Sequence, residues 1–188
     1  TYLIRVGGYT NEYGNGLLTV SGPTTLGACC TTSGCSVTTE LGCTGSFEGL
    51  GTSCTPSPCP GPANDSCANP IILSDGVPVT GTTVGATDDG ASSCGSSNTT
   101  PDVWYAYTPI TTGNVTFSTC TGTTYDTVIS VHNSCPVGST TNQIAAGGCD
   151  DDGCGTSGGP SSRQVSLTAG IRYLIRVTGY NGDTGAFT

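Results

Sequence analysis

Three adjacent carboxylates, at Asp150, Asp151 and Asp152, are the strongest ligand candidate in the sequence. Alternate side chains of an extended segment point the same way, so Asp150 and Asp152 share a face, and oxygen clusters of this kind suit calcium. Adjacent carboxylates repel one another unless a cation or turn amides compensate. The sequence therefore predicts a calcium site at Asp150 and Asp152, with Asp151 and Asp126 beside them. A solvated acidic turn is the alternative.

His132 is the only histidine, and it follows Ser130 by two residues in an alternating run, an arrangement that suggests Ser-His-Asp catalysis. The chain contains no G-x-S-x-G elbow, no P-loop motif and no lysine. A surface histidine is therefore the better interpretation, and Trp104 is expected in a core rather than on a sugar-stacking surface. The sequence predicts no catalytic residue and no enzyme activity.

Twelve cysteines make zinc and disulfides the two rival explanations. Zinc sites need Cys and His clusters at spacings such as C-x₂-C, and no such spacing occurs here. We therefore expect disulfides and an oxidising compartment. Cys149 and Cys154 bracket the acidic loop and are a candidate pair, whereas the neighbours Cys29 and Cys30 are not expected to pair with each other. The remaining connectivity stays open. The cysteines expected to be oxidised are Cys29, Cys30, Cys35, Cys43, Cys54, Cys59, Cys67, Cys94, Cys120, Cys135, Cys149 and Cys154.

Charge and hydropathy exclude two classes of partner. The net charge is −9 and every basic residue is an arginine, so the surface repels nucleic acid and anionic membranes. No apolar run approaches the ~20 residues of a membrane helix, and we expect no membrane insertion. Methionine is absent, which indicates a processed chain or a part of a longer one. Sequons at Asn64, Asn98 and Asn114 are candidate glycosylation sites.

Short alternating runs predict the elements that position these residues. Val103, Tyr105 and Tyr107 alternate with other residues in one run, and similar runs lie near 115–120, 128–132 and 173–177. Strands at 10–15-residue intervals, separated by Gly, Asn and Asp turns, are typical of two antiparallel sheets packed face to face. The sequence therefore predicts an all-β, jelly-roll-like antiparallel β-sandwich over residues 63–188.

An internal repeat is the most informative feature of the chain. Residues 2–9 read Tyr-Leu-Ile-Arg-Val-Gly-Gly-Tyr and residues 173–180 read Tyr-Leu-Ile-Arg-Val-Thr-Gly-Tyr, so seven of eight positions match at an offset of 171. After a two-residue slip, 16–19 parallels 185–188. We interpret residues 1–20 as the last two strands of a preceding or neighbouring sandwich copy. Its predicted assembly residues are Tyr2, Ile4, Val6, Leu17 and Leu18.

Residues 21–62 contain six of the cysteines and form a predicted cysteine-rich linker module. Forty-odd residues cannot bury enough apolar surface to fold unaided, so staples are expected. Alternate prolines from Pro56 to Pro62 favour an extended connector into the sandwich.

The order and spacing of four strands resemble a known family. They are Asp102-Val-Trp-Tyr-Ala-Tyr-Thr, Val115-Thr-Phe-Ser-Thr-Cys, Tyr125-Asp-Thr-Val-Ile-Ser-Val and Gly170-Ile-Arg-Tyr-Leu-Ile-Arg-Val. Over residues 63–188, and again over 1–20, the chain resembles the bacterial pre-peptidase C-terminal domain. The resemblance implies a jelly-roll-like sandwich that is appended to secreted enzymes and surface proteins for binding or stability and does no chemistry itself. The cysteine count exceeds that of the typical family member. Separately, Gly27-Ala-Cys-Cys, Gly34-Cys, Gly42-Cys and Gly51-Thr-Ser-Cys look like a short cysteine-rich repeat of large secreted bacterial proteins.

Two functions fit these features. The first is a structural repeat subunit of an extracellular filament, sheath or adhesin, whose partners are copies of itself joined by strand complementation. Whether those copies are covalently tandem or separate subunits stays open. The second is an accessory glycan- or fibre-binding module of a secreted hydrolase, which predicts an exposed aromatic strip.

Overall fold

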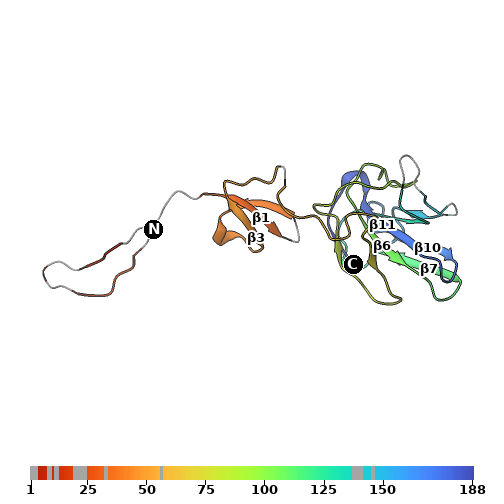
Figure 1. Ribbon diagram of the computed structural model, residues 1–188, viewed down its shortest axis with the longest axis horizontal. Coiled ribbons are helices and arrows are strands. Elements are labelled where there is room, and N and C mark those ends of the chain that lie inside the picture. The colour runs from red at the N-terminus through yellow and green to blue at the C-terminus, as the bar shows by residue number, and fades with distance from the viewer. Residues whose placement is uncertain are drawn as a thin grey trace.

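The structure is a computed structural model that describes residues 4–7, 10, 13–18, 25–31, 34–55, 57–136, 142–144 and 147–188. It contains a small three-stranded sheet and, toward the C-terminus, a larger β-sandwich (Figure 1). Two single-turn 3-10 helices are the only helical elements in this part of the chain, and neither is long enough to cross a membrane. The predicted all-β class, with a sandwich and a small disulfide-stapled module, is confirmed.

The small sheet is built on β1 (Gly27–Thr31), which pairs antiparallel with β2 (Gly34–Thr38) on one side and with β3 (Ser46–Leu50) on the other. A 3-10 turn, η1 (Glu40–Gly42), joins the last two strands, and the Thr39 hydroxyl caps it by accepting a hydrogen bond from the Gly42 amide. Few side chains in this sheet are buried, so apolar packing alone cannot hold it together.

Three disulfides supply what the small core lacks. Neighbouring side chains on a strand point to opposite faces, so Cys29 and Cys30 on β1 bond to different partners. The pairs are Cys29–Cys43, Cys30–Cys59 and Cys35–Cys54. The expectation that Cys29 and Cys30 do not pair with each other is confirmed.

The sandwich is organised around a five-stranded sheet whose order is β4-β6-β11-β8-β9. Its strands are β4 (Ile71–Ile72), β6 (Asp102–Tyr107), β8 (Thr127–His132), β9 (Cys149–Asp150) and β11 (Tyr173–Gly179). The central strand β11 pairs antiparallel with β6 from Tyr173 to Thr178 and with β8 from Leu174 to Gly179. The two-residue edge strand β4 runs parallel to β6, whereas the other strand pairings of the described sandwich are antiparallel.

The second layer is smaller. β7 (Gly113–Ser118) pairs with β10 (Ser162–Leu167), and β5 (Gly81–Thr82) pairs with β12 (Ala186–Phe187), which follows the 3-10 turn η2 (Tyr180–Gly182). Inward-facing residues of both layers form the main core. They include Val103, Tyr105, Tyr107, Phe117, Ile129, Val131, Val165, Leu167, Tyr173, Ile175, Val177 and Phe187.

The five-stranded sheet is buried on its other face as well. Every residue of β6, β8 and β11 is buried, including the alternate positions that point away from the main core. Trp104, Ala106 and Leu174 pack there against the Cys67–Cys135 disulfide. A strand taken from the centre of this sheet would therefore expose buried residues on both of its faces.

Two further disulfides, Cys94–Cys149 and Cys120–Cys154, fasten loops to the sandwich. The predicted Cys149–Cys154 pair is therefore wrong, because the two residues, although close in sequence, face different neighbours. All twelve cysteines are paired, and no disulfide joins the small sheet to the sandwich. Six disulfides indicate folding in an oxidising compartment.

Candidate functional site

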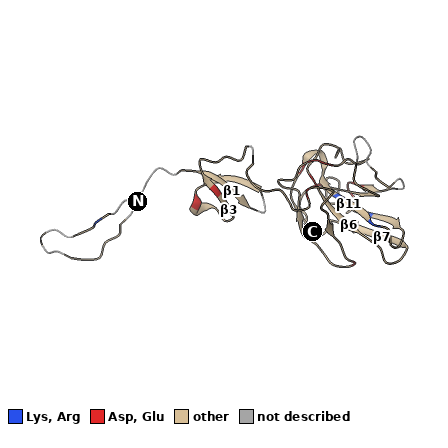
Figure 2. Cartoon of the chain, in the orientation of Figure 1, with Lys and Arg blue, Asp and Glu red and all other residues tan. Residues whose placement is uncertain are grey.

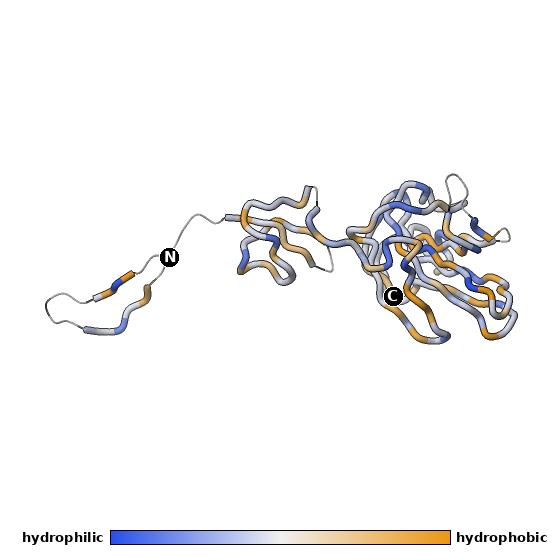
Figure 3. Tube along the Cα trace, viewed as in Figure 1, coloured by the Kyte–Doolittle hydropathy of each residue, from blue (hydrophilic) through white to orange (hydrophobic). Residues whose placement is uncertain are grey.

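The described residues of the N-terminal segment, 4–7, 10 and 13–18, are all exposed. Ile4 and Val6 are 63% and 72% exposed, and Leu17 and Leu18 are exposed too. Figure 1 draws this segment apart from both sheets, and Figure 3 shows that it is partly strongly apolar. Tyr2, the remaining predicted assembly residue, lies outside the described residues. Contiguous exposed apolar side chains are a feature that interaction surfaces share.

The repeat partner of this segment has the opposite environment. Ile175 and Val177, which correspond to Ile4 and Val6, are 2% and 4% exposed and belong to the main core. Both edges of their strand, β11, are filled by hydrogen bonds to β6 and β8. The same sequence motif is therefore the innermost strand of the sandwich at one end of the chain and exposed at the other.

Arg176, in the middle of β11, lies fully buried on the sheet face opposite the main core. Its Nε donates a hydrogen bond to the Asp102 carboxylate, 2.5 Å away on the neighbouring strand. Its Nη2 donates to the carbonyl oxygens of Ser97 and Thr100, and a carboxylate oxygen of Asp88 lies 3.7 Å from the same nitrogen. Figure 2 shows how sparse charge is on this chain, which makes a buried arginine conspicuous.

A loop closes over this ion pair. Asp89 accepts hydrogen bonds from the Trp104 indole and from the Cys67 amide. A Cβ on Gly90 would lie 2.6 Å from Arg176 Nε and 2.6 Å from the Trp104 ring, so only glycine fits there. Complete burial raises the pKa of Asp102 to about 7, although Arg176 opposes the rise. The expectation that Trp104 belongs to a core is confirmed.

The acidic loop uses two of its carboxylates to hold turns. Asp150 accepts hydrogen bonds from the amides of Gly153 and Ser162, at 2.8 and 2.9 Å. Asp152 accepts them from the amides of Gly158 and Gly159. Turn amides thus compensate these two charges. No group of three or more His, Cys, Asp or Glu in the described part of the chain is arranged to hold a metal. Calcium at this loop stays a prediction.

The other two carboxylates of the predicted calcium set have no such compensation. One oxygen of Asp126 and one of Asp151 are buried and accept no hydrogen bond. Burial, followed by repulsion from Asp151, Asp152 and Asp183, raises the pKa of Asp126 to about 6. Burial and the charges of Asp152 and Asp150 also raise the pKa of Asp151. Carboxylate repulsion is therefore concentrated here, and it relaxes when a proton binds.

His132 is fully buried, so its interpretation as a surface residue is wrong. Its Nε2 lies 2.8 Å from the hydroxyl of Ser130, and its ring packs edge-on against Trp104 with centroids 5.2 Å apart. The Ser130 hydroxyl and the indole replace the water that a surface histidine would have. Because Ser130 is fully buried too, a substrate has no access to this pair.

The three sequons lie in different environments. Asn64 is 5% exposed and its amide nitrogen donates to the Trp104 carbonyl, which argues against a glycan there. Asn98 and Asn114 are exposed, and each accepts a hydrogen bond through its side-chain oxygen, from the Ser92 amide and the Ser166 hydroxyl. Their predicted glycosylation stays a prediction.

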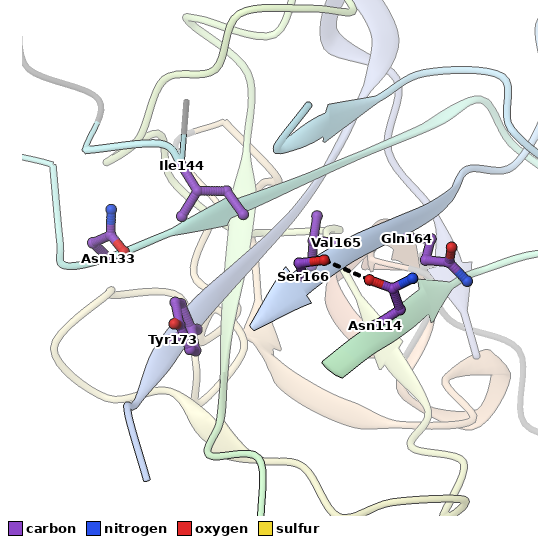
Figure 4. A pocket seen from close by; sticks show the side chains of 7 residues that line it. All are labelled: Asn114, Asn133, Ile144, Gln164, Val165, Ser166 and Tyr173. Carbon is purple, nitrogen blue, oxygen red and sulfur yellow. Dashed lines mark hydrogen bonds between the residues drawn. The ribbon is translucent and has the colours of Figure 1, made fainter. Parts of the chain in front are cut away.

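A cavity of about 500 Å³ lies beside β10. Figure 4 shows it lined by amide and hydroxyl side chains together with an aromatic ring and two aliphatic residues. The lining residues are Asn114, Asn133, Ile144, Gln164, Val165, Ser166 and Tyr173. None is charged, so the cavity suits a neutral ligand rich in hydroxyl groups. Tyr180 is the one exposed aromatic residue of the sandwich, whose aromatic residues are all described, so the predicted exposed aromatic strip is absent.

Sequence reasoning missed the buried Arg176–Asp102 pair, although it identified the repeated motif that contains Arg176, because the two residues are 74 positions apart. No family model matches the chain, and the comparisons with curated proteins and with solved structures found no match. The resemblance to the pre-peptidase C-terminal domain thus stays a prediction.

Proposed function

We propose that the chain is a structural repeat subunit of an extracellular filament, sheath or adhesin. In this proposal residues 1–20 complete the sandwich of another copy, which is a form of β-strand complementation. One observation carries it: the motif at 2–9 repeats that at 173–180, yet Ile4 and Val6 are exposed where Ile175 and Val177 are buried.

Other properties support an extracellular structural role. Six disulfides suit material that must survive outside the cell, where each contributes about 2–4 kcal/mol to the free energy of unfolding. A heterologous contact repeated from copy to copy produces an open fibre when its rotation does not close into a ring. We propose a cell-surface location, copies of the chain as partners, no enzyme activity, and calcium as the one candidate cofactor.

The test is the size of the native, unreduced material. Electrophoresis under denaturing conditions without reductant, and electron microscopy of the undenatured material, should show a very large species or a ladder. A single species of the mass of one sandwich and one cysteine-rich module, in both measurements, contradicts the proposal.

The neutral cavity beside β10 favours a second candidate, which is glycan binding by an accessory module. Amide and hydroxyl groups with an aromatic ring are the groups that orient neutral ligands in binding pockets. A glycan attached at Asn114 would occupy the same cavity, so binding and glycosylation exclude each other there.

Titration of the chain with neutral oligosaccharides tests this second candidate. The double variant Asn133→Ala, Gln164→Ala should lose binding, while Ile110→Ser, at an exposed position outside the cavity, should keep it. Absence of saturable binding to the parent chain removes this candidate.

A further inference from the structure

We infer that residues 2–8 are the central strand of a sandwich copy other than the one at 63–188, with Arg5 ion-paired to the aspartate of that copy that corresponds to Asp102. The inference rests on the proposed function and deepens it, because it names the acceptor. The acceptor is a sandwich that has the equivalents of β6 and β8 but lacks a β11 of its own. It lies covalently upstream in a tandem array.

The two copies of the motif share a backbone turn as well as a sequence. Thr10 and Asn181, which are 171 residues apart like the repeat itself, both have φ of 47°. A β-branched residue rarely adopts this left-handed conformation. Gly8 retains the glycine of position 179, where a Cβ would lie 1.9 Å from the Asp183 carbonyl oxygen. The segment therefore encodes the strand and also the turn that leads into the closing strand.

The position of β11 decides which sandwich can accept this segment. β11 is not an edge strand: it has β6 on one side and β8 on the other. The sandwich at 63–188 therefore has no vacant central position, and neither does any separate subunit that carries the same complete sandwich. Only a copy whose own last strands are residues 2–20 can hold them in this register.

Arg5 separates this arrangement from addition to an outer edge. In the β7–β10 layer, outward-facing side chains such as Thr116 and Gln164 are exposed. An added edge strand there would place Arg5 in solvent while Ile4 and Val6 faced the core. At the centre of the five-stranded sheet, by contrast, the equivalent Arg176 is fully buried against Asp102. A buried, paired Arg5 is thus the signature of the central position.

The sequence correspondence of Leu3 and Arg5 with Leu174 and Arg176 gives a second reason. The equivalent residues Leu174 and Arg176 are both buried, Leu174 in the cluster with Trp104 and Ala106 and Arg176 beside Asp88 and Asp102. Loss of water from a guanidinium group is costly unless a carboxylate and further acceptors replace it. Retention of arginine at position 5 fits a copy that supplies the same carboxylate and carbonyl groups.

The test is hydrogen exchange on the 188-residue chain extended at its N-terminus by a second copy of residues 63–171. This extension contains all three disulfides of the sandwich and lacks only the strands that residues 1–20 supply. In the parent chain, the amides of residues 4–7 should exchange without protection. In the extended chain, their protection should rise by at least about 1,000-fold and approach that of Ile175 and Val177.

Two variants of the extended chain establish the register. Arg5→Ala should remove most of the gained protection, whereas Tyr13→Ser, at an exposed position whose counterpart Thr184 is also exposed, should not. Protection that ignores Arg5→Ala indicates an edge strand and overturns the inference. Unprotected residues 4–7, or an added copy whose cysteines stay reduced, overturn it too. These outcomes leave the proposed function standing, because the size of the native material tests that separately.

Discussion

The buried ion pair gives the sharpest prediction of stability. Asp102→Ala leaves the Arg176 guanidinium fully buried, with carbonyl oxygens around it but without the carboxylate 2.5 Å away. Removal of one partner of a buried pair typically costs about 3–5 kcal/mol in free energy of unfolding. For a domain of this size, that corresponds to a melting temperature lower by roughly 10 °C or more.

Removal of both partners should be far less costly. The pKa of Asp102 is raised because the loss of hydration destabilises the buried carboxylate more than Arg176 stabilises it. The ion pair therefore contributes little net stability. The double variant Asp102→Leu, Arg176→Met should therefore lie within about 1–2 kcal/mol of the parent. The matched control is Arg172→Ala, which at an exposed position of the sandwich should change the free energy by no more than about 0.5 kcal/mol.

Denaturant unfolding followed by the fluorescence of Trp104, the only tryptophan, measures these three variants under oxidising conditions. The single variants Asp102→Leu and Arg176→Met are measured with them and complete the double-mutant cycle. The reasoning predicts a strong coupling between Asp102 and Arg176 in the double-mutant cycle. It would be refuted by an Asp102→Ala variant as stable as the parent, or by single-variant losses that simply add in the double variant.

Three further predictions concern the loops and the small sheet. Folding raises the pKa of Asp126 from 3.8 to about 6, so the stabilisation that protonated Asp126 gives is fully present below pH 3.8 and is lost as pH rises through about 6. Asp126→Asn should therefore raise the melting temperature at pH 7 but not at pH 3.5, and an equal effect at both pH values contradicts this. Reductant should make residues 25–59 sensitive to protease before the sandwich. Three disulfides close loops of 14, 29 and 19 residues in this module, and each contributes about 3–4 kcal/mol to its free energy of unfolding. Simultaneous cleavage of the module and the sandwich would count against this prediction. If calcium binds the acidic loop, chelation with EDTA should lower the melting temperature by an amount equivalent to about 2.7 kcal/mol at a hundredfold excess of calcium over Kd. Asp152→Asn should not respond to EDTA, and an unchanged melting curve of the parent chain would show that turn amides alone compensate the loop.

The period-2 alternation of side chains predicted four of the longer strands of the sandwich. Alternation placed the strands now seen as β6, β7, β8 and β11, because both sheet layers and their buried faces impose a period of two. β10 was missed, since only Val165 and Leu167 stand out from its polar residues. β4, β5, β9 and β12 have two residues each, too few for any periodicity to be visible.

The failures have a common physical cause, which is contact between residues distant in sequence. Burial of His132 depends on Ser130 and on Trp104 across the sheet, so its environment is invisible along the chain. The partner of Cys149 is Cys94, 55 residues away, rather than the nearby Cys154. The repeat could be recognised from sequence identity alone. Which sandwich can accept residues 2–8 could be inferred only from the structure, because it depends on β11 being a central strand.

A structure of the native assembled material tests the central claim most directly, through the surroundings of Arg5. We predict that its guanidinium donates hydrogen bonds to a carboxylate that corresponds to Asp102, on the strand beside it, with Ile4 and Val6 buried as Ile175 and Val177 are. An Arg5 side chain in solvent, or residues 2–8 on the outer edge of a sheet, would contradict the claim.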